Sequence, residues 1–189
     1  MSTSLSTRWI VITGPPSSGK TTLLELLAAD GELTSGDSTR QLIADVVESG
    51  RDAEEFRFAE DFQPRVLEAM LQAEQRLNPD DVVFLEYGLP CNIAFHRTES
   101  LPLTDGLDEA ATAHRYGAVF ILEPVGWESD AERVEDETYQ KVVHQHMFEV
   151  YRERGYDPIP VPAISPAERL ALVRATLGDR STRDPEPSD

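Results

Sequence analysis

Lysine and cysteine are both scarce in this sequence. Only Lys20 and Lys141 are lysines among its 17 basic residues, and Cys91 is its one cysteine. A single cysteine excludes an intrachain disulfide and a zinc site built from several thiolates. No apolar run approaches the roughly 20 residues that span a bilayer, and the first seven residues lack the apolar core of a signal peptide. These absences favour a reducing, cytoplasmic compartment.

Positive charge is also in short supply. The 35 acidic residues outnumber the 17 basic ones, which gives a formal charge of −18. This balance argues against nucleic acid as a main partner and against anionic membrane surfaces, because both attract a basic face. A local basic pocket for a nucleotide remains compatible with an acidic surface. The sequence does not indicate an oligomeric state.

The length and the apolar pattern predict one α/β domain over residues 1–178. Short apolar runs alternate with helical patterns, so we expect a parallel β-sheet flanked by helices in a three-layer sandwich. The predicted strands are Arg8–Thr13, Val82–Glu86, Ala118–Leu122 and Pro158–Val161, with a short connection or brief strand at Glu32–Gly36. The main predicted helices are Gly19–Ala29, Ser38–Ser49, a long stretch with a kink or two abutting helices at Pro64, one ending at Arg154, and Pro166–Leu177. Residues 179–189 should form a disordered tail, since no large apolar residue occurs there.

Two features are predicted in finer detail. The stretch Tyr87–Asp108 is the least regular, with short helices expected at Asn92–Arg97 and Glu109–Tyr116. On the predicted helix Ser38–Ser49, four apolar residues stand at core-facing spacing. They are Leu42, Ile43, Val46 and Val47.

The stretch Gly14–Thr21 is the most informative part of the chain. It reads Gly-Pro-Pro-Ser-Ser-Gly-Lys-Thr and stands between a predicted strand and a predicted helix, which is the context of a phosphate-binding loop. Backbone N–H groups of such a loop point at phosphate oxygens, and the helix N-terminus adds positive potential. Lys20 is expected to reach the β- and γ-phosphates of ATP, and the Thr21 hydroxyl is expected to ligate Mg²⁺. The residues predicted to bind the nucleotide are Gly14, Pro15, Ser17, Ser18, Gly19, Lys20, Thr21 and Thr22.

An acid is also expected near the magnesium ion. Glu86 ends an apolar strand, where a carboxylate is otherwise poorly tolerated, so it is the candidate to hold the metal or to act as a base. The alternative is a strand-end carboxylate that faces solvent. Asp37 and Arg40 open the next helix at the same sheet edge, and Asp37 is equally well suited to cap that helix. Arg133 begins a later helix, where its charge opposes the helix dipole. It is a candidate to close over the phosphates, unless it pairs with nearby acids.

Several pieces together resemble the small AAA-domain P-loop ATPases that include the ribosylnicotinamide kinase domain of the bacterial NAD regulator. These are relatives of the nucleoside and nucleoside monophosphate kinases, and the resemblance covers about residues 8–178. The matching pieces are Ile12–Leu24, Asp37–Arg40, Glu86–Arg97, Asp130–Arg133 and Tyr151–Pro162. The resemblance implies a P-loop, nucleoside-kinase-like fold, Mg²⁺ and ATP at the phosphate loop, and phosphorylation of a small molecule. It also implies that Asp37, Arg40, Tyr87 and Arg97 belong to the substrate site.

The sequence departs from this family at one informative place. Where relatives typically have Asp-Arg-Gly, this chain has Glu86-Tyr87-Gly88, so a basic residue is missing, and Cys91 replaces a frequent Asp. Either the acceptor differs, or Arg40 or Arg97 substitutes, or phosphoryl transfer has been lost. The main interpretation is a kinase that transfers the γ-phosphoryl group of Mg-ATP to a small hydroxylated, nucleoside-like metabolite, with Lys20, Glu86 and Arg133 as catalytic residues. The alternatives are a regulatory ATPase switch without such an acceptor, and an ATPase that acts only within an oligomer.

Overall fold

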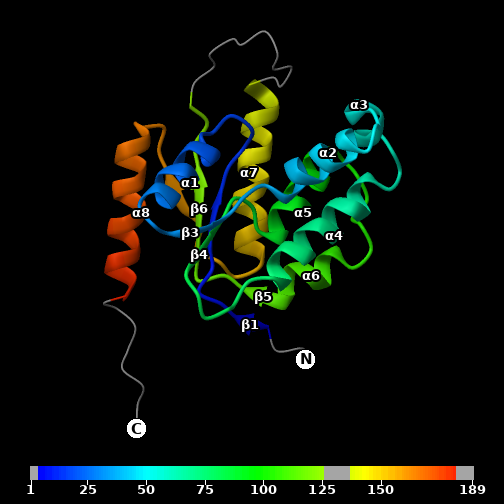
Figure 1. Cartoon of the computed structure of the whole chain (residues 1–189). Helices are drawn as coiled ribbons and strands as arrows, with labels where there is room; N and C mark the ends of the chain where they lie inside the picture. Colours follow the sequence, from blue (N-terminus) through cyan, green and yellow to red (C-terminus); the bar gives the residue numbers. More distant parts are fainter. Residues whose placement is uncertain (1–3, 126–136, 182–189) are drawn as a thin grey trace.

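A five-stranded parallel sheet forms the centre of the molecule. The computed structural model describes residues 4–125 and 137–181, and in them helices cover both faces of this sheet (Figure 1). Every neighbouring pair of its strands is parallel. The strands, in their order across the sheet, are β3 (Leu33–Ser35), β4 (Val83–Leu85), β2 (Ile10–Thr13), β6 (Ala118–Leu122) and β7 (Ile159–Val161). The predicted three-layer α/β fold is therefore confirmed.

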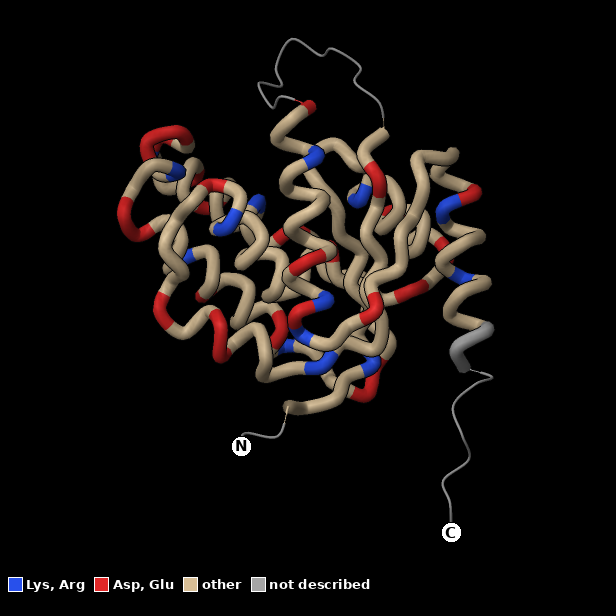
Figure 2. The backbone as a smooth tube through the Cα atoms, turned by 180° about the vertical axis from the view of Figure 1, so that it is seen from behind, with Lys and Arg blue, Asp and Glu red and all other residues tan. Residues whose placement is uncertain are grey.

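The helices are divided between the two faces of the sheet and a projecting arm. One face is covered by α1 (Lys20–Ala29) and α8 (Pro166–Ser181). The other is covered by α4 (Phe62–Gln75), α5 (Leu89–Thr98), α6 (Leu107–Ala113) and α7 (Glu137–Glu153). The arm is formed by α2 (Ser38–Glu48) and α3 (Ala53–Arg57). It carries a concentration of acidic residues around α3 (Figure 2). A separate pair of short strands, β1 (Leu5–Ser6) and β5 (His114–Arg115), ties the N-terminal segment to the body.

Alternation along the central strands divides the core in two. Ile10 and Ile12 of β2 pack with the residues of α1 and α8, whereas Trp9 and Val11 pack with those of α4 to α7. Successive strand residues point to opposite faces, so a strand that is buried on both faces has to be apolar throughout. This is why the short apolar runs are the part of the sequence from which the sheet was predicted correctly.

Of the two forms expected around Pro64, a kinked helix and two abutting helices, the structure has the second. α3 ends at Arg57 and α4 begins at Phe62, so two helices abut and the break comes before the proline. Pro64 lies in the first turn of α4, where its missing N–H removes no helical hydrogen bond. Val47, expected in the core, is 49% exposed, because α2 belongs to the projecting arm and only Val46 of that helix is fully buried.

Two further expectations are corrected. α5 begins at Leu89, so the irregular stretch after Tyr87 is much shorter than predicted. α8 continues through Gly178 to Ser181 instead of ending at Leu177, and residues 182–189 of the expected tail lie outside the described residues. No helix in the described ranges is both long and apolar enough to cross a membrane.

Candidate functional site

The loop between β2 and α1 has the backbone geometry of a phosphate-binding loop. Gly14 packs so closely under β6 that a Cβ there would lie 2.7 Å from the Leu122 carbonyl oxygen. Ser17 and Gly19 both have positive φ, 63° and 83°, which curls the chain before α1 begins at Lys20. A glycine is required at position 14 for lack of space, and it is favoured at position 19 by the left-handed backbone.

Lys20 is turned inward. Its side chain is 5% exposed, its Nζ donates to the Pro15 carbonyl oxygen at 2.9 Å, and Nζ lies 5.1 Å from the centre of the Tyr87 ring. Burial lowers the pKa of Lys20 from 10.5 to about 8, although the nearby Glu86 carboxylate opposes this effect. The ammonium group is therefore poorly compensated by the protein alone, and an anionic ligand at the loop would stabilise its charged form.

Thr21 and Glu86 meet at the start of α1. The Thr21 hydroxyl donates to Glu86 Oε1 at 3.1 Å, and Glu86 is 4% exposed. Burial raises the pKa of Glu86, and the charge of Asp37 adds to this rise. A hydroxyl beside a carboxylate is a hard oxygen donor pair of the kind that Mg²⁺ uses when phosphate oxygens and water supply its other ligands. The described residues contain no cluster of three or more His, Cys, Asp or Glu that could hold a metal ion by themselves.

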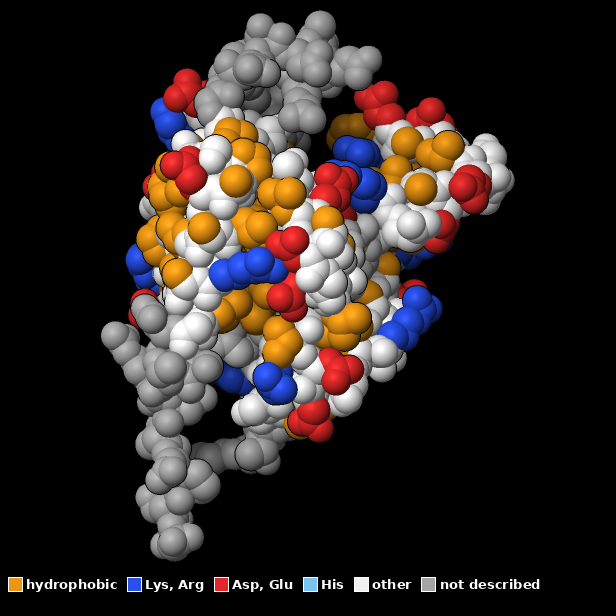
Figure 3. All heavy atoms as spheres, turned by 60° about the vertical axis from the view of Figure 1, so that its left-hand side comes forward, with side chains coloured by type: hydrophobic (Ala, Val, Ile, Leu, Met, Phe, Trp, Pro, Cys, Tyr) orange, Lys and Arg blue, Asp and Glu red, His pale blue; other side chains and the backbone are white. Residues whose placement is uncertain are grey.

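A cleft of about 1690 Å³ extends from the phosphate loop. The loop residues, Thr22 and the segments that follow β3 and β4 line it. Helices α4 and α5 and the 101–104 segment also contribute to its walls. Figure 3 shows the surface hollowed between the body of the molecule and the projecting arm. The cleft thus follows the carboxyl ends of parallel strands, which is where ligands bind in open α/β sheets.

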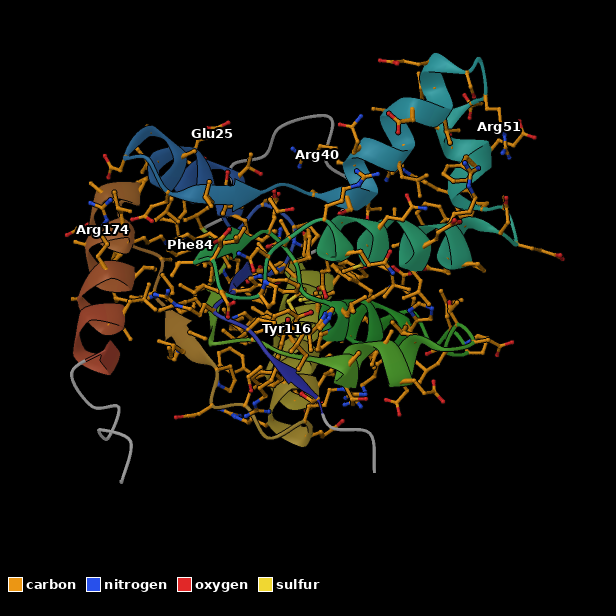
Figure 4. The ribbon with its side chains drawn as sticks, turned by 60° about the horizontal axis from the view of Figure 1, so that its bottom comes forward. Glu25, Arg40, Arg51, Phe84, Tyr116 and Arg174 are labelled. Carbon is orange, nitrogen blue, oxygen red and sulfur yellow. The ribbon has the colours of Figure 1, made fainter. Side chains whose placement is uncertain are left out.

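Three of the four residues predicted for a substrate line this cleft. They are Asp37, Arg40 and Tyr87. Asp37 also caps α2, with Oδ1 accepting from the N–H groups of Thr39 and Arg40 at 2.9 and 3.1 Å, so both roles proposed for it are compatible. Arg40 stands at the start of α2, near α1, whereas Arg51 lies at the far end of the arm (Figure 4). Among the described residues Arg40 forms no ion pair within 4.0 Å.

The fourth predicted residue, Arg97, is not brought to the cleft. Its guanidinium group binds Glu153 on α7 with two hydrogen bonds of 2.8 Å and approaches Glu149 at 3.5 Å. α5 packs along α7, and this pairing holds Arg97 on the outer side of the two helices. Arg133 lies outside the described residues.

Two residues of the site were missed by the sequence analysis. Asn92 on α5 lines the cleft, is 5% exposed, and its Nδ2 has no hydrogen-bond partner in the described part of the chain. A buried amide without a partner is costly, so this atom is suited to bind a ligand. Arg169 on α8 is 2% exposed and hydrogen-bonds the phosphate loop. The only signals for these residues were a polar side chain in an apolar helix and a buried charge near a helix N-terminus, both of which depend on the fold to be recognised.

Cys91 stands at the position where an Asp is frequent in the family that the sequence resembles. Its side chain is buried and hydrogen-bonded to two hydroxyl groups. Its thiol exchanges hydrogen bonds with the hydroxyl groups of Thr13 and Tyr151 at 3.2 and 3.1 Å. Burial raises the pKa of this thiol. Cys91 therefore stays neutral and joins the end of β2 to α7, although it is also one of the residues that line the cleft.

Comparisons with known proteins agree with this geometry. The model of a family described as AAA domain matches residues 9–169, and no curated protein is significantly similar to the sequence. Among solved structures, NadR protein in complex with NR has a TM-score of 0.72 at 16% identity. The match covers 97% of this chain and 54% of that one, so the chain spans about half of NadR.

Two kinases match over nearly their whole lengths. Thymidylate kinase from Candida albicans has a TM-score of 0.62 at 12% identity, with 98% of each chain covered. Deoxyadenosine kinase from M. mycoides with bound dATP has a TM-score of 0.63 at 14% identity, with 90% of this chain and 99% of that one covered. At these identities the structures establish the fold. The family match and the fold together show that the chain belongs to the AAA domain family, with the P-loop fold of the nucleoside kinases.

Proposed function

We propose that this protein is a kinase that transfers the γ-phosphoryl group of ATP to a hydroxyl group of a small, nucleoside-like molecule. The observation that carries the proposal is the meeting of Thr21 and Glu86, 3.1 Å apart, at the boundary between two parts of one cleft. The phosphate loop forms one part, and α2, α4 and α5 line the other. An acid at this boundary lies where the γ-phosphate of ATP and an acceptor would meet.

The phosphate loop supplies the nucleotide end of this site. Lys20 and the backbone N–H groups of the loop would hold the phosphates, and the phosphate charge would return Lys20 to its charged form. Thr21 and Glu86 are the protein oxygens that would hold Mg²⁺. When bound, this ion neutralises the charge that develops on the transferred phosphoryl group. Arg133, on the evidence of the sequence, is proposed as an additional arginine for the same charge.

Glu86 is also placed to act on the acceptor. Its raised pKa suits a base that takes a proton from a hydroxyl group, and Asp37 supplies a second carboxylate in the same part of the cleft. Arg40 is proposed to supply the positive charge that Tyr87 cannot. It lines the cleft, and its charge lowers the pKa values of Lys20, Glu86 and Tyr87.

The acceptor end favours a flat ring that carries a hydrogen-bond acceptor. Tyr87 and Phe95 line it as an edge-to-face pair with ring centres 6.0 Å apart, and aromatic walls of this kind bind planar groups. The unpartnered Nδ2 of Asn92 would donate to a carbonyl oxygen or ring nitrogen of that group.

One observation favours a second candidate function, a nucleotide-dependent switch. The same inward position of Lys20, with Nζ on the Pro15 carbonyl and the Tyr87 ring beside it, would change when phosphate binds. Tyr87 leads directly into α5, so nucleotide binding could alter that helix without any transfer to an acceptor.

Incubation with Mg²⁺ and γ-labelled ATP plus a metabolite extract, followed by separation of the products, tests the two candidates. Label on a new small molecule supports the kinase, provided that Lys20→Ala abolishes the transfer. Lys141→Ala is the matched control, because Lys141 is a surface lysine that pairs with Glu137. Label found only in free phosphate would contradict the kinase proposal and support the switch.

A further inference from the structure

Arg169 is a buried cation that has no carboxylate partner among the described residues. It lies in the first turns of α8, is 2% exposed, and forms no ion pair within 4.0 Å in the described part of the chain. Burial lowers its pKa. A positive charge near a helix N-terminus is also opposed by the helix dipole. Both costs call for strong compensating contacts.

Those contacts are backbone carbonyl groups from three separate segments. Nε donates to the Pro162 carbonyl oxygen at 2.9 Å, and one terminal nitrogen donates to that of Glu123 at 2.8 Å. The other terminal nitrogen donates to the Ser18 carbonyl oxygen. The guanidinium group thereby joins the chain after β7, the chain after β6 and the phosphate loop. Only a planar group with donors on three nitrogens can bind all three at once.

The contact with Ser18 has a consequence for the loop. The carbonyl of Ser18 and the N–H of Gly19 belong to one trans peptide group, so they point in opposite directions. With the carbonyl held by Arg169, the Gly19 N–H points away from α8, and Gly19 itself lines the cleft. A Cβ at Gly19 would lie 3.2 Å from the Arg169 nitrogen that binds the Ser18 carbonyl. The guanidinium group therefore packs closely against Gly19 as well as Ser18.

We propose that Arg169 is a positioning residue of the nucleotide site, which holds the Ser18–Gly19 peptide in the orientation that binds phosphate before any nucleotide arrives. This inference rests on nucleotide binding by the loop, but not on phosphoryl transfer. Arg169 touches no ligand in this role. It acts through the loop by removing the freedom of one peptide group and by anchoring the loop to the ends of β6 and β7.

Two substitutions of Arg169, compared with two control substitutions elsewhere on α8, distinguish this role from the packing of that helix. Arg169→Met removes all three hydrogen bonds, and Arg169→Lys keeps the charge but loses the planar fork. Val173→Ala is the matched control, because Val173 is fully buried on the same sheet face, in an apolar cluster that includes no residue of the loop. Arg174→Met is a second control, since Arg174 is a surface residue paired with Asp30 at 2.9 Å.

The measurements are the Kd for Mg-ADP by calorimetry and hydrogen exchange of the loop amides without nucleotide. We expect the Kd to rise about tenfold or more in both Arg169 variants, which corresponds to about 1.4 kcal/mol, with faster exchange at Ser18–Lys20. We expect Val173→Ala to lower Tm with less than a twofold change in Kd. A wild-type Kd in both Arg169 variants, or an equal loss in Val173→Ala, would overturn the proposal.

The outcome for the wild type distinguishes this inference from the proposed kinase function. If the wild type binds Mg-ADP but transfers no phosphoryl group, the kinase proposal fails and the role of Arg169 is still decided by the variants. If the wild type binds no nucleotide, both proposals are overturned.

Discussion

The hydroxyl group of Thr21 donates a hydrogen bond to the carboxylate of Glu86 over 3.1 Å, across a sequence separation of 65 residues. This contact joins the first turn of α1 to the end of β4. Thr21 is half-buried and Glu86 is buried, and both line the cleft. In the proposed function the γ-phosphate of ATP and the acceptor meet beside this pair.

Replacing Glu86 with Gln tests this pair directly. Gln keeps the size and can still accept from Thr21, but it cannot take a proton from an acceptor hydroxyl. We expect kcat to fall about 10²- to 10⁴-fold, while the Kd for nucleotide measured without Mg²⁺ changes less than threefold. Glu25→Gln on the exposed side of α1 is the control. An unchanged kcat in Glu86→Gln would refute the role of the carboxylate as a base.

Nucleotide binding should take up a proton at alkaline pH. The free protein loses the charge of Lys20 as the pH rises through about 8, whereas bound phosphate keeps the ammonium charged to a higher pH. The complex therefore holds more protons than the free protein above pH 8, and affinity should fall by up to tenfold for each further pH unit. Calorimetry at pH 9 in two buffers of different ionisation enthalpy measures this uptake.

Two variants test whether the proton is taken up by Lys20. Lys141→Ala should retain the uptake, because Lys141 is exposed on α7 and pairs with Glu137. Glu86→Gln should shift the onset to lower pH, since the Glu86 charge normally raises the pKa of Lys20. Binding at pH 9 without proton uptake would contradict the assignment.

Asn92 should govern recognition of the acceptor. Its unpartnered Nδ2 in the cleft predicts that Asn92→Ala raises the KM for the acceptor found by label transfer about tenfold, because a ligand atom is left without a donor. The KM for ATP should stay within twofold. Asn92→Asp should be at least as damaging, since it replaces the donor by an acceptor. Equal changes in both KM values would indicate a structural role for Asn92 instead.

Replacing Gly88 with Ala should lower the stability of the fold, whether or not a ligand is bound. A Cβ there would lie 2.9 Å from ring atoms of Tyr116 and 2.9 Å from the Tyr151 hydroxyl, and both tyrosines are buried. Gly88→Ala should therefore destabilise the protein by about 1–3 kcal/mol. Gly178→Ala, with nothing within 4 Å of the new Cβ and a helical backbone, should be neutral or stabilise by up to about 1 kcal/mol. Urea denaturation compares the two, and an unchanged midpoint for Gly88→Ala would contradict the packing.

The sequence by itself determined the features that depend on a local pattern of residues, namely the buried strands, the phosphate loop and the start of α8. Continuous apolar runs indicate β2, β4 and β6, because strands that are buried on both faces have no polar alternation. Glycine spacing before Lys20 and Thr21 identifies the phosphate loop, since its curled backbone needs residues without a Cβ. Ser165–Glu168 has the sequence of a capping box at the start of α8. The Glu168 carboxylate accepts from the Ser165 N–H at 3.0 Å, and Ser165 Oγ accepts from the Glu168 N–H at 3.3 Å.

Only the tertiary structure decided which distant side chains meet. Arg97 was a reasonable candidate on α5, but the packing of α5 on α7 turns it toward Glu153, away from the cleft. Asn92, five residues earlier on the same helix, lines the cleft instead. Arg169 reaches Ser18 across a separation of 151 residues. No local pattern carries that information, because a buried hydrogen bond depends on the distance and direction between elements, and the packing of the whole chain sets these.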